Sequence, residues 1–228
     1  MTDLVSSSIS SSISWSLVPI APVVAVLVAG AIAIAGIEGG VPKLAWIFKP
    51  LATLLLLAVV GWPQTSFARL TIAGILLSVI GDVALLSESD TAFQVGLVAF
   101  LAAHVVYIVA NLNVAIWSPW IVPAALVVLL ATVFLLRLVR PSHVVLRAAT
   151  IVYGIAISAM VISSFATIGG PLHWAPLAAV GSVLFYVSDA SLAINRFHRP
   201  IPHVAYLAIG VYWLGQIGIA LAAHGPVR

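Results

Sequence analysis

Two aspartates lie in the middle of long apolar segments, where charged side chains are rare. Asp82 lies in the segment AGILLSVIGDVALL, and Asp189 lies in GSVLFYVSDASLAI. A carboxylate at the centre of a membrane span costs roughly 2.5–3.5 kcal/mol on insertion scales, so such residues usually have a function. Two neighbouring buried carboxyl groups can share one proton and act as general acid and general base. We therefore predict that Asp82 and Asp189 converge in one cavity, where they share a proton and transfer it during catalysis.

Four polar residues are expected at the same depth in the membrane. Each lies six or seven residues from a charged residue near one membrane face, and they are Lys49, Asp82, Tyr153 and Asp189. Because a helix rises about 1.5 Å per residue, all four lie roughly 9–10 Å from that face. Thr53 shares a helix face with Lys49, since the two are four residues apart. The spacing thus predicts one polar layer built from four helices.

Two further segments add polar side chains with helical spacing. One stripe has spacings of 4, 4, 3 and 4, which place its members on one helix face: Gly96, Phe100, His104, Tyr107 and Asn111. Tyr212 and Gln216 are four residues apart and also share a face. Together with the aspartates, these residues predict a polar pocket inside an apolar bundle, open toward the inner leaflet.

Each of these residues also has an ordinary structural interpretation. A tyrosine can pack in a bundle with its hydroxyl on a backbone carbonyl, and a lone residue such as His104 is more often a core histidine than a catalyst. Gln216 can link helices. Lys49 can extend to the membrane surface or pair with one aspartate. A pair with Lys49 explains one acid and leaves the other unpaired, so we favour a functional pair of acids.

The composition is that of an integral membrane protein. Hydrophobic residues make up 63% of the 228 residues, charged residues only 7%, and the mean hydropathy is +1.25. A soluble domain of this length could not cover its surface with so few charges. The chain has no cysteine, which excludes disulfides and thiolate chemistry. The net charge of +3 comes from basic residues scattered over short loops, so a nucleic-acid partner is not expected.

Apolar runs of membrane-spanning length predict an all-α bundle of eight transmembrane helices. The expected spans are 18–37, 44–61, 68–86, 92–112, 119–138, 146–168, 173–195 and 203–223. Proline, glycine and charged residues separate them, and the joints are too short for another domain. We expect a serine-rich disordered lead-in at 1–17, a single transmembrane domain at 18–223 and a short tail at 224–228.

Basic residues predict the orientation of these spans. The loops after the first, third, fifth and seventh spans contain Lys43, Arg137, Arg140, Arg147, Arg196 and Arg199. The opposite side has only Arg69 and Arg228. Because loops rich in Lys and Arg stay in the cytoplasm, both termini are predicted to be extracytoplasmic in a multi-pass protein of a bacterial plasma membrane.

An internal similarity relates the two halves of the chain. A shift of 107 residues aligns Asp82 with Asp189, Gly74 with Gly181, and several leucines with one another. Matched leucines carry little information in so apolar a chain, whereas coincident acids carry more. The shift predicts two four-helix pseudo-repeats with an axis along the membrane normal and the two acids facing each other across it.

Several short blocks of residues occur in order on six of the eight spans, and they are Phe48–Leu51, Ser78–Asp82, Phe93–Tyr107, Tyr153–Gly154, Gly181–Asp189, and Tyr212 with Gln216. Together these blocks resemble the lysoplasmalogenase or YhhN-like family of eight-span membrane proteins. Each block is short, but their order and spacing make the resemblance fairly specific. It covers most of the chain from about residue 45 onward.

The resemblance implies a hydrolase that acts on lysoplasmalogens, which are 1-alkenyl glycerophospholipids with a free 2-hydroxyl. Cleavage of the vinyl-ether bond would release a fatty aldehyde and glycerophosphocholine or glycerophosphoethanolamine. The catalytic acids of the family correspond to Asp82 and Asp189. The implied substrate-binding residues are Lys49, His104, Tyr107, Tyr153, Ser188, Tyr212 and Gln216. The expected partners are this lysophospholipid and the surrounding membrane lipids.

The chemistry implied by the resemblance matches a pair of acids. A vinyl ether is stable to base but labile to acid, because protonation of its β-carbon gives an oxocarbenium ion that water traps. One carboxylic acid would supply the proton and an anionic neighbour would stabilise the cation and the water. The sequence does not assign these two roles between Asp82 and Asp189. Lys49 could instead bind the lipid phosphate.

No cofactor and no metal are expected. Membrane hydrolases that use zinc need several histidines inside the spans, and here only His104 lies well inside one. A small lipid carrier or proton-coupled carrier is the alternative function, because buried acids and repeats also occur in transporters. The expected spans have no paired Gly/Pro breaks near the two aspartates, which favours the hydrolase.

Overall fold

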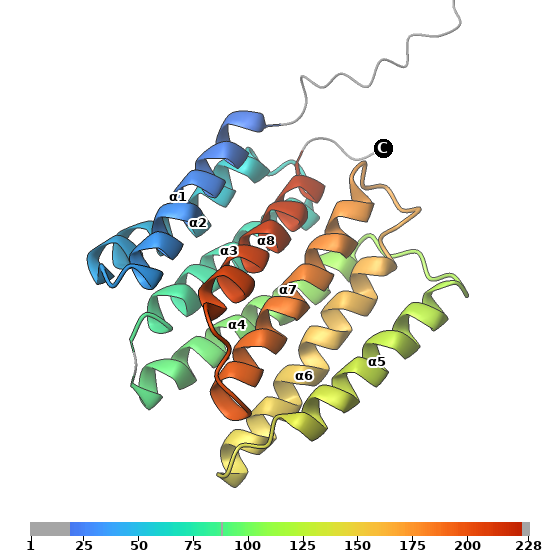
Figure 1. Ribbon diagram of the computed structural model, residues 1–228. Helices are drawn as coiled ribbons and strands as arrows, with labels where there is room; N and C mark the ends of the chain where they lie inside the picture. Colours follow the sequence, from blue (N-terminus) through green and yellow to red (C-terminus); the bar gives the residue numbers. More distant parts are fainter. Residues whose placement is uncertain (1–18, 88, 225–228) are drawn as a thin grey trace, which may run out of the picture.

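The structure, a computed structural model, describes residues 19–87 and 89–224. Its described part is all-α, with eight helices in chain order (Figure 1): α1 Ile20–Glu38, α2 Pro42–Val60, α3 Ser66–Ala84, α4 Asp90–Leu112, α5 Ile121–Leu138, α6 Val144–Phe165, α7 Ala175–Phe197 and α8 Val211–Ala222. The bounds of the first seven helices agree with the predicted spans to within three residues, whereas α8 begins eight residues after the predicted start of the last span. The predicted lead-in at 1–17 lies outside the described residues, as does the predicted tail except for His224.

Seven of the helices are long and apolar enough to cross a membrane, and the eighth is shorter. A π-helical turn at Tyr206–Gly210 precedes α8, so the last helical segment runs from Tyr206 to Ala222. The sequence predicted an ordinary eighth span and gave no sign of the π turn. With large apolar side chains exposed over most helices, the chain is an integral multi-pass membrane protein.

The helix contacts repeat between the two halves of the chain. In the first half α1 packs on α2, α2 on α3 and α3 on α4; in the second half α5 packs on α6, α6 on α7 and α7 on α8. The halves meet through α2 with α8 and through α4 with α6. Figure 1 shows α8 between the α1–α2 pair and α7, with α5 at the opposite edge from α1. These contacts have the pattern expected of two four-helix repeats.

Glycines allow the central helices to approach closely. A Cβ atom on Gly215 would lie 2.7 Å from the carbonyl oxygen of Gly181, so α7 and α8 pack backbone against backbone. A Cβ on Gly81 of α3 would lie 2.5 Å from the ring of Phe100 on α4. Small residues at such positions are typical of helix pairs in membranes. They bring both aspartate-bearing helices, α3 and α7, against their neighbours.

The two aspartate-bearing helices begin at clear sequence signals. At the start of α3, Thr65 Oγ1 accepts a hydrogen bond from the backbone N–H of Ala68 at 3.0 Å, as an N-cap residue does. Pro176 lies in the first turn of α7, where its missing N–H is not needed. These signals fix where each helix starts and therefore the depth at which Asp82 and Asp189 lie.

Candidate functional site

Asp82 lies in a closed cluster formed by α2, α3 and α8. Its Oδ2 accepts hydrogen bonds from Thr53 Oγ1 at 2.5 Å and from Tyr212 OH at 2.9 Å. Lys49 Nζ lies 3.4 Å from Asp82 Oδ1 and donates to the Asp82 carbonyl oxygen at 3.2 Å. Trp213 Nε1 donates to Thr53 Oγ1 at 3.1 Å, so the Thr53 hydroxyl accepts one hydrogen bond and donates its own to Asp82. With an exposure of only 1%, Asp82 forms a buried ion pair with additional donors.

A hydrogen-bond network continues from Asp82 toward the other end of the bundle. Gln216 Nε2 donates to Ser78 Oγ at 3.0 Å and to Tyr212 OH at 3.3 Å. Tyr107 OH donates to Gln216 Oε1 at 2.8 Å. The network thus ties α3, α4 and α8 together around the first aspartate, and satisfied buried networks of this kind make a site rigid.

Asp189 has fewer polar partners than Asp82. Tyr153 OH of α6 donates to Asp189 Oδ2 at 2.5 Å. His104 Nε2 of α4 lies 3.6 Å from the same oxygen, which is too long for a hydrogen bond. Neither ring nitrogen of His104 has a hydrogen-bond partner within residues 19–87 and 89–224. The His104 ring packs edge-on against Tyr153 and Phe185, with centroids 5.1 and 4.8 Å apart.

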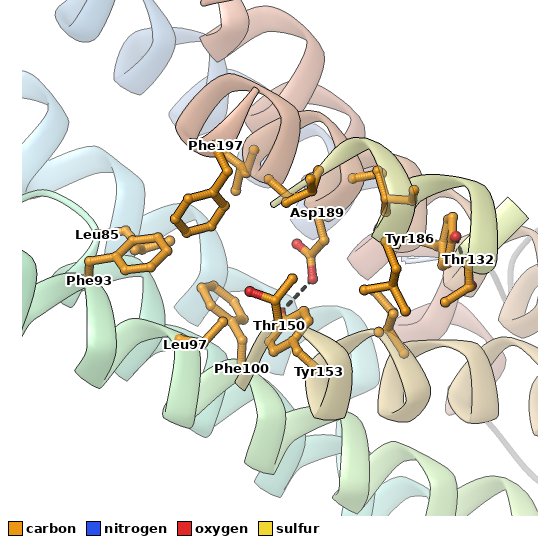
Figure 2. A pocket seen from close by; sticks show the side chains of 18 residues that line it. Leu85, Phe93, Leu97, Phe100, Thr132, Thr150, Tyr153, Tyr186, Asp189 and Phe197 are labelled. Atoms are coloured by element: carbon orange, nitrogen blue, oxygen red, sulfur yellow. Dashed lines mark hydrogen bonds between the residues drawn. The ribbon is translucent and has the colours of Figure 1, made fainter. Parts of the chain in front are cut away.

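Asp189 points into an apolar cavity between α4, α5, α6 and α7 (Figure 2). This aspartate cavity spans about 790 Å³, counting the part that is open to the surroundings. Figure 2 shows Phe93, Leu85 and Phe197 on one side of Asp189, and Tyr186 and Thr132 on the other. Asp189 is the one carboxyl group among the described lining residues, and Asp82 is not among them.

The two aspartates take their neighbours from corresponding helices of the two halves. Asp82 on α3 takes Lys49 and Thr53 from α2 of its own half, and Tyr212 from α8, the last helix of the other half. Asp189 on α7 likewise takes its partner from α6 and has His104 of α4, the last helix of the first half, beside it. The repeat therefore relates the helices around the two acids, whereas the side chains in the two aspartate constellations differ.

An aromatic layer separates the two constellations. The Phe185 ring lies 5.1 Å from the Tyr212 ring and 4.8 Å from the His104 ring, centroid to centroid. In the described part of the chain no hydrogen bond links the Asp82 network to the Tyr153–Asp189 pair. The carboxyl groups do not touch, so any cooperation between them acts through charge.

The predicted site residues fall into three groups. Lys49 and Tyr212 contact Asp82, whereas Tyr153 and His104 lie beside Asp189. Tyr107 and Gln216 join the network but do not line the cavity. Ser188 donates to the carbonyl oxygen of Ala208 in the π-helical turn at 2.7 Å, and it is also absent from the cavity wall.

Three residues near the site were not singled out from the sequence. Trp213 orients Thr53, and Thr132 and Tyr186 lie at one end of the cavity with their hydroxyl oxygens 2.9 Å apart. Tyr186 lies one helical turn before Asp189, which is a signal that could have identified it. Thr132 is the one hydroxyl-bearing side chain between residues 121 and 138 and could have been noticed for the same reason.

Sequence comparison finds relatives that are named lysoplasmalogenase. The chain is 30% identical to human lysoplasmalogenase TMEM86B over 195 residues, which cover 81% of this chain and 79% of the human protein. It is 31% identical to pig lysoplasmalogenase TMEM86B over 148 residues, covering 65% and 60% of the two chains. Bovine lysoplasmalogenase TMEM86A is 26% identical over 157 residues, covering 66% of this chain and 63% of the bovine protein.

No solved structure matches the chain. The match to the YhhN family covers residues 44–223, from the start of α2 to the end of α8, and so includes both aspartate constellations. Since that is most of the chain, this protein belongs to the YhhN family.

Proposed function

We propose that this protein is a membrane hydrolase that cleaves the vinyl-ether bond of lysoplasmalogens, with Asp189 as the proton donor. The observation that supports this most directly is the position of Asp189, an acid held by one tyrosine in the wall of an otherwise apolar cavity. An acid-labile bond next to a hydrocarbon chain fits such a cavity. The relatives named lysoplasmalogenase support the same substrate class.

The reaction needs one proton donor that also acts as an acceptor. Asp189 gives its proton to the β-carbon of the vinyl ether, which leaves an oxocarbenium ion beside the new carboxylate. Water adds to the cationic carbon while Asp189 takes back a proton, and the resulting hemiacetal collapses to aldehyde and glycerophospho-alcohol. The sum is one water consumed, one C–O bond broken and the acid regenerated. Tyr153, bonded to Oδ2, orients the carboxyl group.

Asp82 has a different role in this proposal. Its ion pair with Lys49 and its two hydroxyl donors keep it as the anionic member of the pair. It is a positioning residue, because it does not line the cavity and acts through charge across the Phe185 ring. Lys49 is buried and engaged with Asp82, so in this scheme it is not the phosphate ligand.

The test uses full-length protein purified in detergent and a synthetic 1-alkenyl lysophosphatidylcholine, with released aldehyde as the readout. Wild type should release aldehyde, and Asp189→Asn should lose about 10²–10⁴-fold in rate, which is the contribution of a general acid. Glu38→Gln is the matched control, since this acid lies on α1 and pairs with His203. A wild type that binds or moves the lipid without releasing aldehyde would support a carrier and end the proposal.

A further inference from the structure

A second apolar depression continues from the aspartate cavity toward the other membrane face. This outer groove spans about 830 Å³, counting its open part, and lies between α5, α6 and α7. Its wall consists of Pro123, Ala124, Val127, Val128, Ala131, Val161, Phe165, Val183 and Tyr186. Tyr186 is common to both walls, so its ring stands between the cavity and the groove.

A small polar cluster holds that ring in place. The Tyr186 hydroxyl oxygen lies 2.9 Å from Thr132 Oγ1, which lies 2.7 Å from Ser158 Oγ. These three hydroxyls come from α7, α5 and α6. Thr132 is one of only two buried residues on the described helix α5, and the other is Ile121 at the helix start. The cluster is therefore the main polar tie between α5 and the bundle.

The helices α5 and α7 do not pack closely against each other, so there is space between them. Among the described helices, α5 makes extensive contact only with α6. The equivalent helix of the first half, α1, packs on α2, on α8 and on the π-helical turn. As a result, the space beside α7 is bounded by side chains and not by close-packed backbone.

The other end of the aspartate cavity lies next to a basic side chain. The Arg196 guanidinium lies 4.9 Å over the Phe93 ring, and Phe93 lines that end of the cavity. Arg196 is 43% exposed and pairs with Asp90 at 2.6 Å. An arginine at the mouth suits a phosphate. With the head group there and the vinyl ether at Asp189, the hydrocarbon chain extends toward Tyr186.

We propose that the hydrocarbon chain of the substrate passes Tyr186 into the outer groove, and that the Tyr186–Thr132 contact limits the length of chain the enzyme accepts. The identity of the lipid rests on the proposed function, whereas the path rests on the two cavities and their shared residue. The wall of the groove has no charged side chain, so its occupant is an apolar chain.

The path is tested by photolabelling, which does not depend on hydrolysis. The probe is a 1-O-alkyl lysophosphatidylcholine, which lacks the vinyl ether, with a diazirine near the methyl end of its chain. In nanodiscs with full-length protein, we expect label on residues 123–131 and on Val183–Tyr186, reduced by excess unlabelled lysolipid. A diacyl lipid with the same diazirine serves as the control for general membrane contact. Label spread equally by both probes, or concentrated on α1 and α3, would overturn the path.

The length limit is tested with substrates of 12, 16 and 20 carbons. Tyr186→Ala should raise the ratio of kcat/KM for the longest to the shortest chain by about tenfold, since a single methylene already changes selectivity by about that factor in a tight pocket. Tyr186→Phe retains the ring but loses the hydroxyl contact with Thr132, so it should raise the same ratio by a smaller factor than Tyr186→Ala. Val187→Ala, on the lipid-facing side of α7, is the control and should leave the ratio unchanged.

A second variant approaches the groove from α5. Ala124→Trp narrows the groove about two helical turns away from Thr132, and it should lower the same ratio by about tenfold. If both variants leave the ratio unchanged, the length limit is wrong. If wild type releases no aldehyde from any substrate, the proposed function is wrong, while the photolabelling still decides the path.

Discussion

The two halves of the bundle place an aspartate at the same position but surround it differently. Asp82 is sealed among Lys49, Thr53 and Tyr212, whereas Asp189 has one tyrosine and an apolar cavity. The difference follows the outer helices: α1 covers α2 and α8, but α5 covers little besides α6. A repeat can thus supply one acid that is held in place by its partners and another that is free to meet a substrate.

The most direct test of this difference between the two aspartates is to neutralise each acid in turn. Asp189→Asn should lower the rate of aldehyde release by about 10²–10⁴-fold with a nearly unchanged thermal midpoint, because it loses the proton but keeps the shape and the bond from Tyr153. Asp82→Asn should lower both the rate and the midpoint, because it leaves Lys49 buried without its counter-charge. Aldehyde release and thermal unfolding in detergent check both effects.

Equal behaviour of the two variants in both measurements would contradict the division of roles. Full activity in Asp189→Asn would contradict the assignment of the donor itself.

Removing the cation should have the next largest effect. Lys49→Met leaves Asp82 buried and uncompensated, which costs about 3–5 kcal/mol in the free energy of unfolding when one partner of a buried pair is removed. The double variant Lys49→Met with Asp82→Asn should regain much of that loss, since no uncompensated charge remains. Unfolding followed by tryptophan fluorescence in detergent provides the measurement.

The matching experiment in the second half of the chain removes the partner of Asp189. Tyr153→Phe removes one hydrogen bond to Asp189, and the expected cost in unfolding free energy is only about 0.5–1.5 kcal/mol. Its effect on aldehyde release should be larger, about tenfold, because the tyrosine orients the reacting carboxyl group. If Tyr153→Phe lost more stability than Lys49→Met, the contacts of Asp189 and not those of Asp82 would be the ones that stabilise the bundle.

Much of the architecture followed from the amino-acid sequence for simple reasons. Membrane spans are set by the length of apolar runs, so all eight were expected within three residues of their positions once the π turn is counted with the last span. The contacts of Lys49 with Asp82 and of Tyr153 with Asp189 are consistent with the common depth that the constant helical rise predicts. The stripe from Gly96 to Asn111 was also correct, and its members are buried on α4.

The asymmetry of the site could not be read from the sequence. Which aspartate meets a cavity depends on the distance between α5 and α7, and that distance depends on side chains from three helices around Thr132. The partner of Lys49 was likewise open, because residues at one depth can face different neighbours. The π-helical turn at Tyr206–Gly210 adds one residue to a turn, and no residue type marks such an insertion.

The smallest expected effect is that of changing Ser188. The family resemblance implies that this residue binds substrate, whereas its contacts in the structure are with the protein backbone. The residue precedes Asp189 in the sequence but points about 100° away around the helix, where it donates to the carbonyl oxygen of Ala208. Ser188→Ala should therefore cost about 0.5–1.5 kcal/mol in the free energy of unfolding and change aldehyde release less than threefold. Ser188→Cys, which keeps a weak donor, is the conservative control. If KM for the lysolipid rises tenfold in Ser188→Ala while the thermal midpoint is unchanged, the serine contacts the substrate, and α7 must rotate when the lipid binds.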